Sequence, residues 1–483
     1  MLRPRRAATI VWPLALALLA AGACGPRPRT TTPVAPVEAA RPSLPSRFDA
    51  DAVATWFDAQ ATARGLVGAQ LGVMRDGEVV LVRSHGTAVR GGAPVTPQTA
   101  FAIGSITKQF VCAAAVLLQQ QGRLSLADPV AKYYPELTRA DEITLDDLGA
   151  HLSGYPDYYP LDFLDSRMRA AIDPDALLQR YAGAPLQFEP RSRWSYSNTG
   201  YILLGRVIER VTGVPLGAWL REHVFGRVGM TGASLDPAPG TAGLAAGHGR
   251  FALGEPEPVP REAAGWIHAA GGIYTTATEL LRWDLALADR SLLGADTDRL
   301  TTPRTLRDGR STDYGCGLGV RHQAGEVVWS HSGAVSGFVA FNAIVPRTRT
   351  AVVLLSNTET PAASELHQEL LALVIAPPDA VPTVAGPPAT EVAGALFEQL
   401  QRGALDRRAL APELAGYYDD ARVRAAAPRL RALGTVLRVE ADRPRERGGL
   451  EVTSVRLVLA ARVIKAVLVR RPDGIVEQFL LLE

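Results

Sequence analysis

Ser105 and Lys108 lie three residues apart in the segment FAIGSITKQF, and this spacing could support nucleophilic catalysis. If a helix begins at Ser105, both side chains occupy one face of its first turn, near the positive end of the helix dipole. A serine hydroxyl attacks well only when a base takes its proton, and a buried lysine can lose enough basicity to be that base. Of the 51 lysines and arginines in the chain, only three are lysines. Because arginine stays protonated, a lysine here indicates that its proton must be able to leave.

A second polar group precedes the apolar, periodic segment that begins at Thr199 in RWSYSNTGYILLGRVIERVTG. Asn198 could simply be the N-cap of that helix. In a functional interpretation, Tyr196 transfers a proton if a cation such as Lys108 lowers its pKa, and Asn198 binds a substrate amide. Both interpretations are compatible with the sequence.

A third group lies in VVWSHSGAVSGFVAF, where we expect a strand to end in His331, Ser332 and Gly333 and to turn into the next strand. Glycine at such a place lets a ligand or a strand-like substrate approach the backbone. A plain hairpin turn would also explain the pattern.

The three groups follow one another as S-x-x-K, Y-x-N and H-x-G, and together they are far more specific than any one alone. In this order they resemble the serine beta-lactamase and penicillin-recognising hydrolase family, in its class C-like branch. The resemblance covers about residues 50–376. It extends to the segments ITLDDLGAHLSGYPDY, VPLGAWLREHVFGRVGM and AAGGIYTTATELLRW.

This resemblance implies an α/β (α+β) fold, in which an antiparallel sheet has helices on both faces and the site lies beside a mainly helical lobe. Ser105 would be the acylated nucleophile, with Lys108 and Tyr196 handling protons. The backbone N–H groups of Ser105 and Ala334 would form the oxyanion hole. The implied substrate-binding residues are Asn198, His331, Ser332, Gly333 and Ala334.

One departure from the best-known members of the family concerns the substrate. Lactamases usually carry lysine where His331 stands, and histidine is mostly neutral at pH 7. Histidine resembles the peptidase and esterase members, so lactam hydrolysis ranks low. No E-x-x-L-N segment supplies a separate deacylation carboxylate, which leaves that step to Tyr196 and Lys108. We expect no metal and no cofactor, because no H-E-x-x-H or dinucleotide-binding pattern is present.

The sequence therefore predicts a serine hydrolase that acts through an acyl-enzyme on an ester or amide, such as a D-amino-acid peptide derived from peptidoglycan. D,D-carboxypeptidase, D-aminopeptidase and carboxylesterase activities stay open. The alternative is a catalytically weak protein that binds or senses peptidoglycan or penicillin. A net charge of +2 without a dense basic run argues against a nucleic-acid partner. The oligomeric state is left open.

Residues 1–23 are typical of a signal peptide, because arginines precede a long apolar run. AGAC resembles a lipobox, so we expect export to the cell envelope and lipidation of Cys24, which would anchor the chain to a bacterial membrane. Plain secretion and a retained anchor are the alternatives. Residues 24–48 form a proline-rich tether, 49–376 the hydrolase domain, 377–391 a linker and 392–483 a small C-terminal α+β domain.

Within the hydrolase domain, residues 69–84 indicate a hairpin, residues 106–121 a fully buried helix, and residues 319–333, 338–346 and 350–357 three further strands. The two ends of the domain would thus build one sheet. Cys112 and Cys316 could pair or remain buried thiols, and the sequence does not decide between these states. The C-terminal domain carries no recognisable chemistry. It could position the enzyme, cover the cleft or mediate dimerisation.

Overall fold

The computed structural model describes residues 48–159, 166–252, 254–375, 381–442, 444–447 and 450–482. The predicted signal peptide, most of the predicted tether and Cys24 lie outside these ranges. No helix in the described ranges combines the length and the apolar character needed to cross a membrane.

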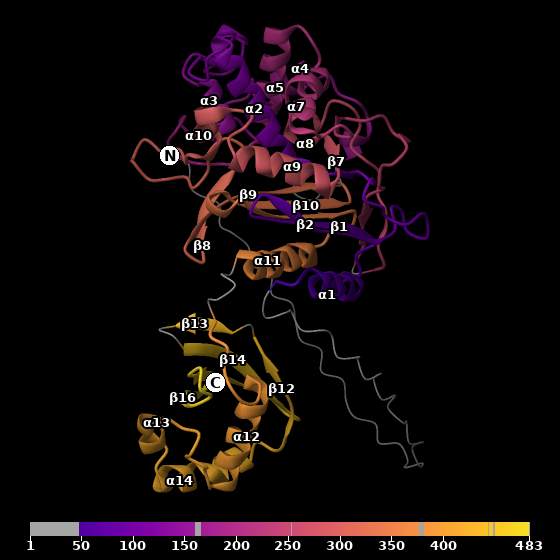
Figure 1. The fold of residues 1–483 in the computed structure, drawn as a ribbon. Helices are drawn as coiled ribbons and strands as arrows, with labels where there is room; N and C mark the ends of the chain where they lie inside the picture. Colours follow the sequence, from indigo (N-terminus) through magenta and orange to yellow (C-terminus); the bar gives the residue numbers. More distant parts are fainter. Residues whose placement is uncertain are drawn as a thin grey trace, which may run out of the picture. The chain divides into compact units, whose positions relative to one another are not determined.

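A six-stranded antiparallel sheet forms the centre of the predicted hydrolase domain, in the order β2-β1-β11-β10-β9-β8 (Figure 1). The hairpin predicted around Asp76 and Gly77 is present, and both residues have positive φ. The first two strands pair with the last through β1 and β11, so the prediction that the two ends of the domain share one sheet is confirmed. The strands are β1 (Gly68–Arg75), β2 (Glu78–Gly86), β8 (Gly319–Gln323), β9 (Glu326–Val335), β10 (Phe338–Val345) and β11 (Thr350–Ser356).

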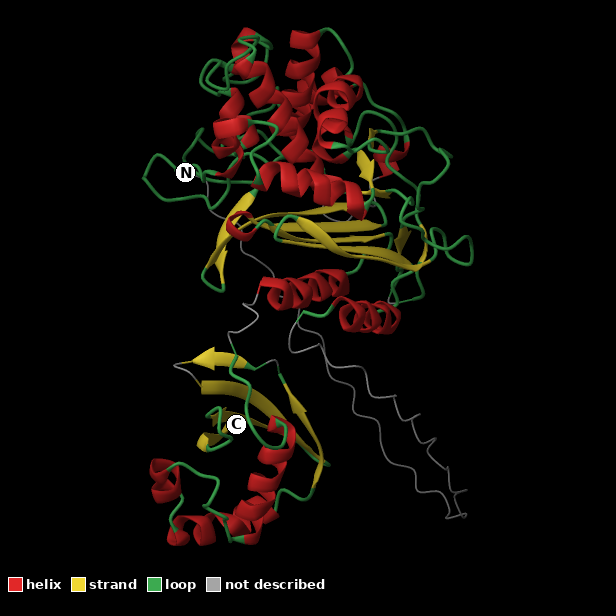
Figure 2. Cartoon of the chain, in the orientation of Figure 1, coloured by secondary structure: helices red, strands yellow, loops and turns green. Residues whose placement is uncertain are grey.

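Helices cover both faces of this sheet (Figure 2). Helices α1 (Ala50–Ala63) and α11 (Pro361–Ile375) pack on one face, where alternate strand residues such as Val352 join their core. The opposite face carries the helical lobe, and Val353 belongs to its core. Because both faces are covered, β11 is buried along its whole length, which explains its unbroken apolar sequence.

Helix α2 (Thr107–Gln120) runs through the middle of the lobe, and its residues are buried from Thr107 to Leu118. A short 3₁₀ turn, η1 (Gly104–Ile106), precedes it, so Ser105 lies on this turn and not in the α-helix that was expected to begin there. The other helices of the lobe are α3 (Leu145–Gly149), α4 (Pro174–Tyr181), α5 (Asn198–Thr212), α6 (Leu216–Leu220), α7 (Gly226–Val228), α8 (His268–Gly271), α9 (Ala277–Ala288) and α10 (Asp298–Thr301). Short strands β3 (Phe101–Ala102), β4 (Ser234–Leu235) and β7 (Ile273–Thr275) form one small sheet, and β5 (His248–Gly249) and β6 (Glu257–Pro258) another.

The C-terminal part of the chain has its own core, built around Phe397, Leu457, Leu468 and Phe479. An antiparallel sheet in the order β12-β14-β15-β16 and the helices that pack on it share this core, and β13 pairs with β14. The elements are α12 (Ala389–Arg402), α13 (Pro412–Tyr417), α14 (Asp420–Arg431), β12 (Val436–Ala441), β13 (Arg445–Arg447), β14 (Leu450–Leu459), β15 (Val463–Arg470) and β16 (Val476–Leu482). The fold is thus α+β, as predicted.

Candidate active site

The turn that carries Ser105 is pressed against strand β9. Gly104 has φ +50°, and a Cβ on it would lie 2.7 Å from the backbone nitrogen of Ala334. A Cβ on Gly333 would lie only 2.9 Å from the nitrogen of Ser105. Both glycines are therefore required by close backbone contact, since any side chain would push the two segments apart. This contact places the backbone segments of Ser105 and Ala334, the two residues expected to form the oxyanion hole, side by side.

Ser105 Oγ has two polar neighbours from different elements. Lys108 Nζ lies 2.9 Å away, and the hydroxyl of Tyr196 donates to Ser105 Oγ over 2.6 Å. Tyr196 precedes α5 and is 91 residues distant in the sequence, so the fold brings together the residues of the first two motifs. Ser105 and Tyr196 are half-buried, whereas Lys108 is completely buried.

Lys108 is held at the bottom of the site by two further oxygen atoms. Its Nζ contacts Asn198 Oδ1 at 2.8 Å and the carbonyl oxygen of Ala270, in α8, at 2.6 Å. Burial lowers the pKa of Lys108 to about 7, while the negative charge of Asp157 acts in the opposite direction. A substantial fraction of Lys108 is therefore neutral near pH 7, as a general base must be.

The partners of Lys108 fix where its lone pair points. Asn198 Oδ1 and the Ala270 carbonyl can only accept, so a neutral amine gives its two hydrogens to them. The lone pair then faces Ser105 Oγ. Burial raises the pKa of Tyr196, so this phenol stays protonated and donates to Ser105. The condition that a cation such as Lys108 lowers the pKa of Tyr196 is not met, because burial and the charge of Asp157 both raise this pKa.

Asn198 is the first residue of α5, and Ser197 occupies the N-cap position. The interpretation of Asn198 as an N-cap is therefore wrong. Its Oδ1 accepts from Lys108, and its Nδ2 donates to both oxygens of Asp157, at 3.2 and 3.1 Å. Asp157 also accepts from the backbone N–H of Asn198. The carboxylate thus orients the Asn198 side chain with its oxygen toward the lysine.

His331 does not end a strand, as the sequence suggested. Strand β9 continues to Val335, and the turn follows at Ser336 and Gly337. Gly333, the glycine of the H-x-G motif, is needed because the turn that carries Ser105 packs against it. A turn pattern in the local sequence cannot reveal this contact. Ser332 and Ala334, on the alternate positions of β9, have exposed side chains.

The imidazole of His331 has a partner on each nitrogen. Nδ1 donates to the carbonyl oxygen of Ser332, so Nε2 must accept from the hydroxyl of Tyr314, 2.9 Å away. Burial and the nearby charge of Lys108 lower the pKa of His331 to about 4. At neutral pH this wall of the site therefore carries no positive charge.

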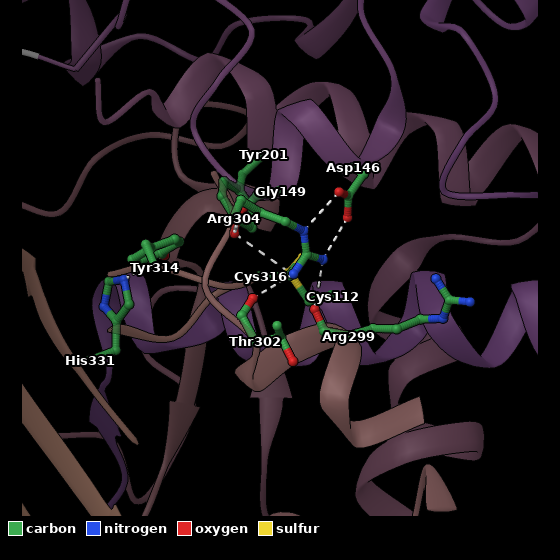
Figure 3. Close-up of a disulfide and its surroundings, with 10 residues drawn as sticks. All are labelled: Cys112, Asp146, Gly149, Tyr201, Arg299, Thr302, Arg304, Tyr314, Cys316 and His331. Atoms are coloured by element: carbon green, nitrogen blue, oxygen red, sulfur yellow. Dashed lines mark hydrogen bonds and ion pairs between the residues drawn. A yellow bond between two sulfur atoms is a disulfide. The ribbon is translucent and has the colours of Figure 1, made fainter. Parts of the chain in front are cut away.

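Cys112 and Cys316 form a disulfide, with their Cα atoms 5.8 Å apart. Of the two states that the sequence left open, the structure contains the bonded one. Cys112 lies one turn after Lys108 in α2, and Cys316 lies two residues after Tyr314. Figure 3 shows Tyr314 extending from this disulfide-linked loop toward His331. The disulfide therefore links α2, the helix that carries Lys108, to the loop whose Tyr314 contacts His331.

Ser105, Tyr196, Asn198 and His331 line a common cavity of about 270 Å³. The aromatic segment HLSGYPDYY, residues 151–159, supplies Asp157, Tyr158 and Tyr159 to the lining. His151, from the same segment, is buried, accepts from the backbone N–H of Ser197 and lies against the Tyr196 ring. In the described ranges, no three of the residues His, Cys, Asp and Glu come together as a metal site would require.

Sequence reasoning missed three contributors: Asp157, Tyr314 and the Ala270 carbonyl. Each of the three forms a hydrogen bond to a site residue that is distant in the sequence. Ala270 contributes only its backbone carbonyl oxygen. The aromatic character of the segment around Asp157 was the sole signal that could have pointed to one of them.

A buried lysine beside a serine, between a helical lobe and an antiparallel sheet, is an arrangement that serine hydrolases use. Residues 53–376 match the family described as Beta-lactamase, which is most of the chain. The protein belongs to the Beta-lactamase family, as its motifs indicated.

Individual relatives have several names. The chain is 29% identical over 317 residues to a D-aminopeptidase of Brucella anthropi, covering 64% of this chain and 59% of that one. It is 35% identical over 237 residues to the esterase EstB of Burkholderia gladioli, covering 45% of this chain and 57% of that one. The D-amino acid amidase from Ochrobactrum anthropi SV3, solved with L-phenylalanine amide, is similar in fold, with a TM-score of 0.60. That likeness, at 23% identity, covers 68% of this chain and 99% of the amidase.

Proposed function

We propose that this hydrolase acylates Ser105 and releases the acyl group to water, with an ester or amide as its substrate. The observation that carries the proposal is the environment of Lys108: a fully buried amine with a pKa of about 7 whose lone pair faces Ser105 Oγ. Names of relatives that include D-aminopeptidase and esterase support the choice of substrate class.

In the acylation step, Ser105 Oγ attacks the substrate carbonyl carbon while its proton passes to Lys108 Nζ. The oxyanion that forms is stabilised by the N–H groups of Ser105 and Ala334. When the intermediate collapses, the leaving group takes a proton from Tyr196, which Lys108 restores. Water then attacks the acyl-enzyme and gives a proton to the same pair, which returns a proton to Ser105 Oγ as the acyl bond breaks and the acid departs.

The neutral His331 supports a substrate without a carboxylate beside the scissile bond. A penicillin or a C-terminal D-alanine carries such a carboxylate and would be attracted by a permanent cation. With both imidazole nitrogens already bonded and the pKa near 4, His331 offers none at neutral pH. Amides and esters of D-amino acids, including those from peptidoglycan, fit this wall better than lactams do.

A fluorophosphonate tests the proposal on the full chain, because it forms a Ser105 Oγ–P bond with loss of fluoride. We expect one adduct by intact mass on the parent and none on Ser105→Ala. The adduct should form much more slowly on Lys108→Met, and Lys132→Met is the control because Lys132 is a solvent-exposed lysine paired with Asp128. A folded parent that forms no adduct would contradict the proposal and would favour a binding or sensing protein.

The same proposal includes export and lipidation of Cys24, for which the sequence alone is the support. Expression of the parent and of Cys24→Ser in a bacterium fed with labelled fatty acid tests it. We expect label on the parent in the membrane fraction and none on the variant. An unlabelled parent recovered in the medium would favour plain secretion.

A further inference from the structure

His151 binds the segment that carries Tyr196 on both sides of that tyrosine. The carbonyl oxygen of His151 accepts from the backbone N–H of Ser195 at 3.1 Å, and its Nδ1 accepts from that of Ser197 at 3.0 Å. His151 has φ +61°, which is uncommon for a residue with a side chain. In this conformation its main chain and its ring hold the same three-residue segment. The backbone of Tyr196 is therefore held through both of its neighbours.

The imidazole ring of His151 also packs against the phenol ring of Tyr196. The two ring centroids are 4.3 Å apart, and the ring planes meet at 34°. Three more aromatic rings have their centroids 5.0–5.6 Å from the imidazole, those of Trp194, Tyr201 and Tyr314. This packing restricts the direction in which the phenol points, and its hydroxyl donates to Ser105 Oγ.

The bond to Ser197 fixes the tautomer of His151. A backbone N–H can only donate, so Nδ1 must carry a lone pair. Burial and the charge of Lys108 lower the pKa of His151 well below its usual value, so the ring is neutral and its proton is on Nε2. Nε2 is buried and has no hydrogen-bond partner within the described ranges, which costs free energy. Because a phenylalanine would pack among these rings without that cost, the acceptor at Nδ1 is what the histidine contributes.

His151 lies behind Tyr196 as seen from the substrate. Tyr196 lines both the catalytic cavity and an adjoining cavity of about 420 Å³, and His151 lines neither of the two. Any effect of His151 on the reaction must therefore pass through the residues it holds. In the proposed reaction Tyr196 gives a proton to the leaving group, and a displacement of such a group by about 1 Å can lower a rate by about 10²-fold.

We propose that His151 is a positioning residue, which holds the hydroxyl of Tyr196 where it can protonate the leaving group. This inference rests on the proposed acyl-enzyme reaction and describes how its proton donor is kept in place. The acceptor at Nδ1 is decisive, because it fixes the backbone of Ser197 beside the tyrosine. A leaving group that departs as a stable anion should depend little on His151, whereas an alkoxide or an amine should depend on it strongly.

The test compares 4-nitrophenyl butanoate with ethyl butanoate on the full-length protein. The 4-nitrophenolate ion leaves without a proton, whereas ethoxide must be protonated as it leaves. Since the leaving group departs during acylation, kcat/KM reports this step. We expect His151→Phe to lower kcat/KM by about 10²-fold for the ethyl ester and by at most about fivefold for the 4-nitrophenyl ester. The ratio of kcat/KM for the 4-nitrophenyl ester to that for the ethyl ester should thus rise at least about twentyfold.

Two further variants separate positioning from a general effect on structure. His151→Asn should keep this ratio within about threefold of the parent, because its Oδ1 can accept from Ser197 and asparagine tolerates positive φ. Tyr196→Phe should raise the ratio by itself, and adding His151→Phe should raise it no further, since the hydroxyl through which His151 acts is missing. If His151→Phe fails to fold by circular dichroism, His151→Ala replaces it, because water in the vacated space can satisfy the Ser197 N–H.

His248→Phe is the matched control. His248 is also fully buried, and its Nε2 also accepts from a backbone N–H, that of Arg90. This variant should leave the ratio unchanged. An equal loss on both esters in His151→Phe would assign the residue a purely structural role and overturn the inference.

The inference and the proposed reaction fail in different ways. A further rise of the ratio when His151→Phe is added to Tyr196→Phe would overturn the inference alone, because His151 would then act by a route other than the tyrosine. A ratio that Tyr196→Phe leaves unchanged would contradict the proposed proton transfer from Tyr196, and the inference with it. Failure of the parent to hydrolyse either ester, with no fluorophosphonate adduct, would contradict the proposed reaction as a whole.

Discussion

The floor of the cleft and its strand wall are built in opposite ways. The floor, consisting of Lys108, Asn198 and the carbonyl of Ala270, is buried, and its polar atoms bond to one another. The wall, residues 331–336 of β9 and the turn after it, exposes alternate side chains to the cavities. The floor sets protonation states through burial, whereas the wall lines the cavities with uncharged side chains. We therefore expect changes in the floor to abolish the reaction and changes in the wall to alter its selectivity.

The largest effect is expected for Lys108→Arg, which keeps the charge but cannot release a proton. Hydrolysis of a 4-nitrophenyl ester should fall by about 10³-fold, within the range that general-base catalysis contributes. Lys132→Arg, at an exposed lysine, should retain the parent rate. If Lys108→Arg fails to fold by circular dichroism, Lys108→Met replaces it. A variant at Lys108 that keeps a tenth of the activity would refute the role of this residue as the base.

The disulfide connects floor to wall, so removing it should affect both. Cys112→Ala/Cys316→Ala should lower the free energy of unfolding by about 2–5 kcal/mol, as measured with urea. Because Cys316 is near Tyr314, which holds His331, activity toward a 4-nitrophenyl ester should also fall, by about two- to fivefold. An unchanged urea midpoint would mean that packing alone fixes the loop.

His331→Lys should change the selectivity of the wall. An ammonium there would attract a carboxylate, so acylation of Ser105 by a penicillin, followed by intact mass, should become about tenfold faster. His322→Lys adds the same charge on β8 at an exposed position and serves as the control. Equal acceleration in both variants would assign the effect to net charge and not to the wall.

The smallest change is expected in the pH profile. Since the neutral form of Lys108 is active and its pKa is about 7, kcat/KM should rise with pH and reach half its maximum near pH 7. The charge of Asp157 raises the pKa of Lys108, so Asp157→Asn should shift the rising part of the kcat/KM profile, the limb assigned to Lys108, to lower pH. Glu222→Gln, at an exposed residue, should leave it in place. A shift to higher pH in Asp157→Asn would contradict the assignment of the limb to Lys108.

The sequence was informative where the physics is local. Alternating and unbroken apolar runs predicted the strands, and the apolar run FVCAAAVLL, residues 110–118, predicted the buried central helix. The pairing of Ser105 with Lys108 also followed from spacing within one turn. That Tyr196 and His331 would converge on this turn could not be derived from spacing and came only from the family resemblance.

Interpretations based on local sequence failed where contacts with residues far along the chain determine the role of a residue. Asn198 has the residue type of a cap, yet its side chain is used by Lys108 and Asp157, from elements far along the chain. Gly333 has the residue type of a turn, yet it is needed because another segment approaches it. The pairing of Cys112 with Cys316 depends on a sequence separation of 204 residues, over which sequence carries no distance information.

The burial of Lys108 also has a consequence for the folding of the domain. In the unfolded chain its pKa is near 10.5, and in the folded chain it is about 7, so the unfolded state binds more protons between these values. Stability should therefore rise with pH from about 7 to 10.5 and be lowest, for this residue, below pH 7. Lys108→Met should remove that penalty and raise the free energy of unfolding at pH 7 by on the order of a few kcal/mol. Lys108, the residue proposed to activate Ser105, would then also lower the thermal stability of the protein. Activity and stability would thus place opposite demands on the same amine.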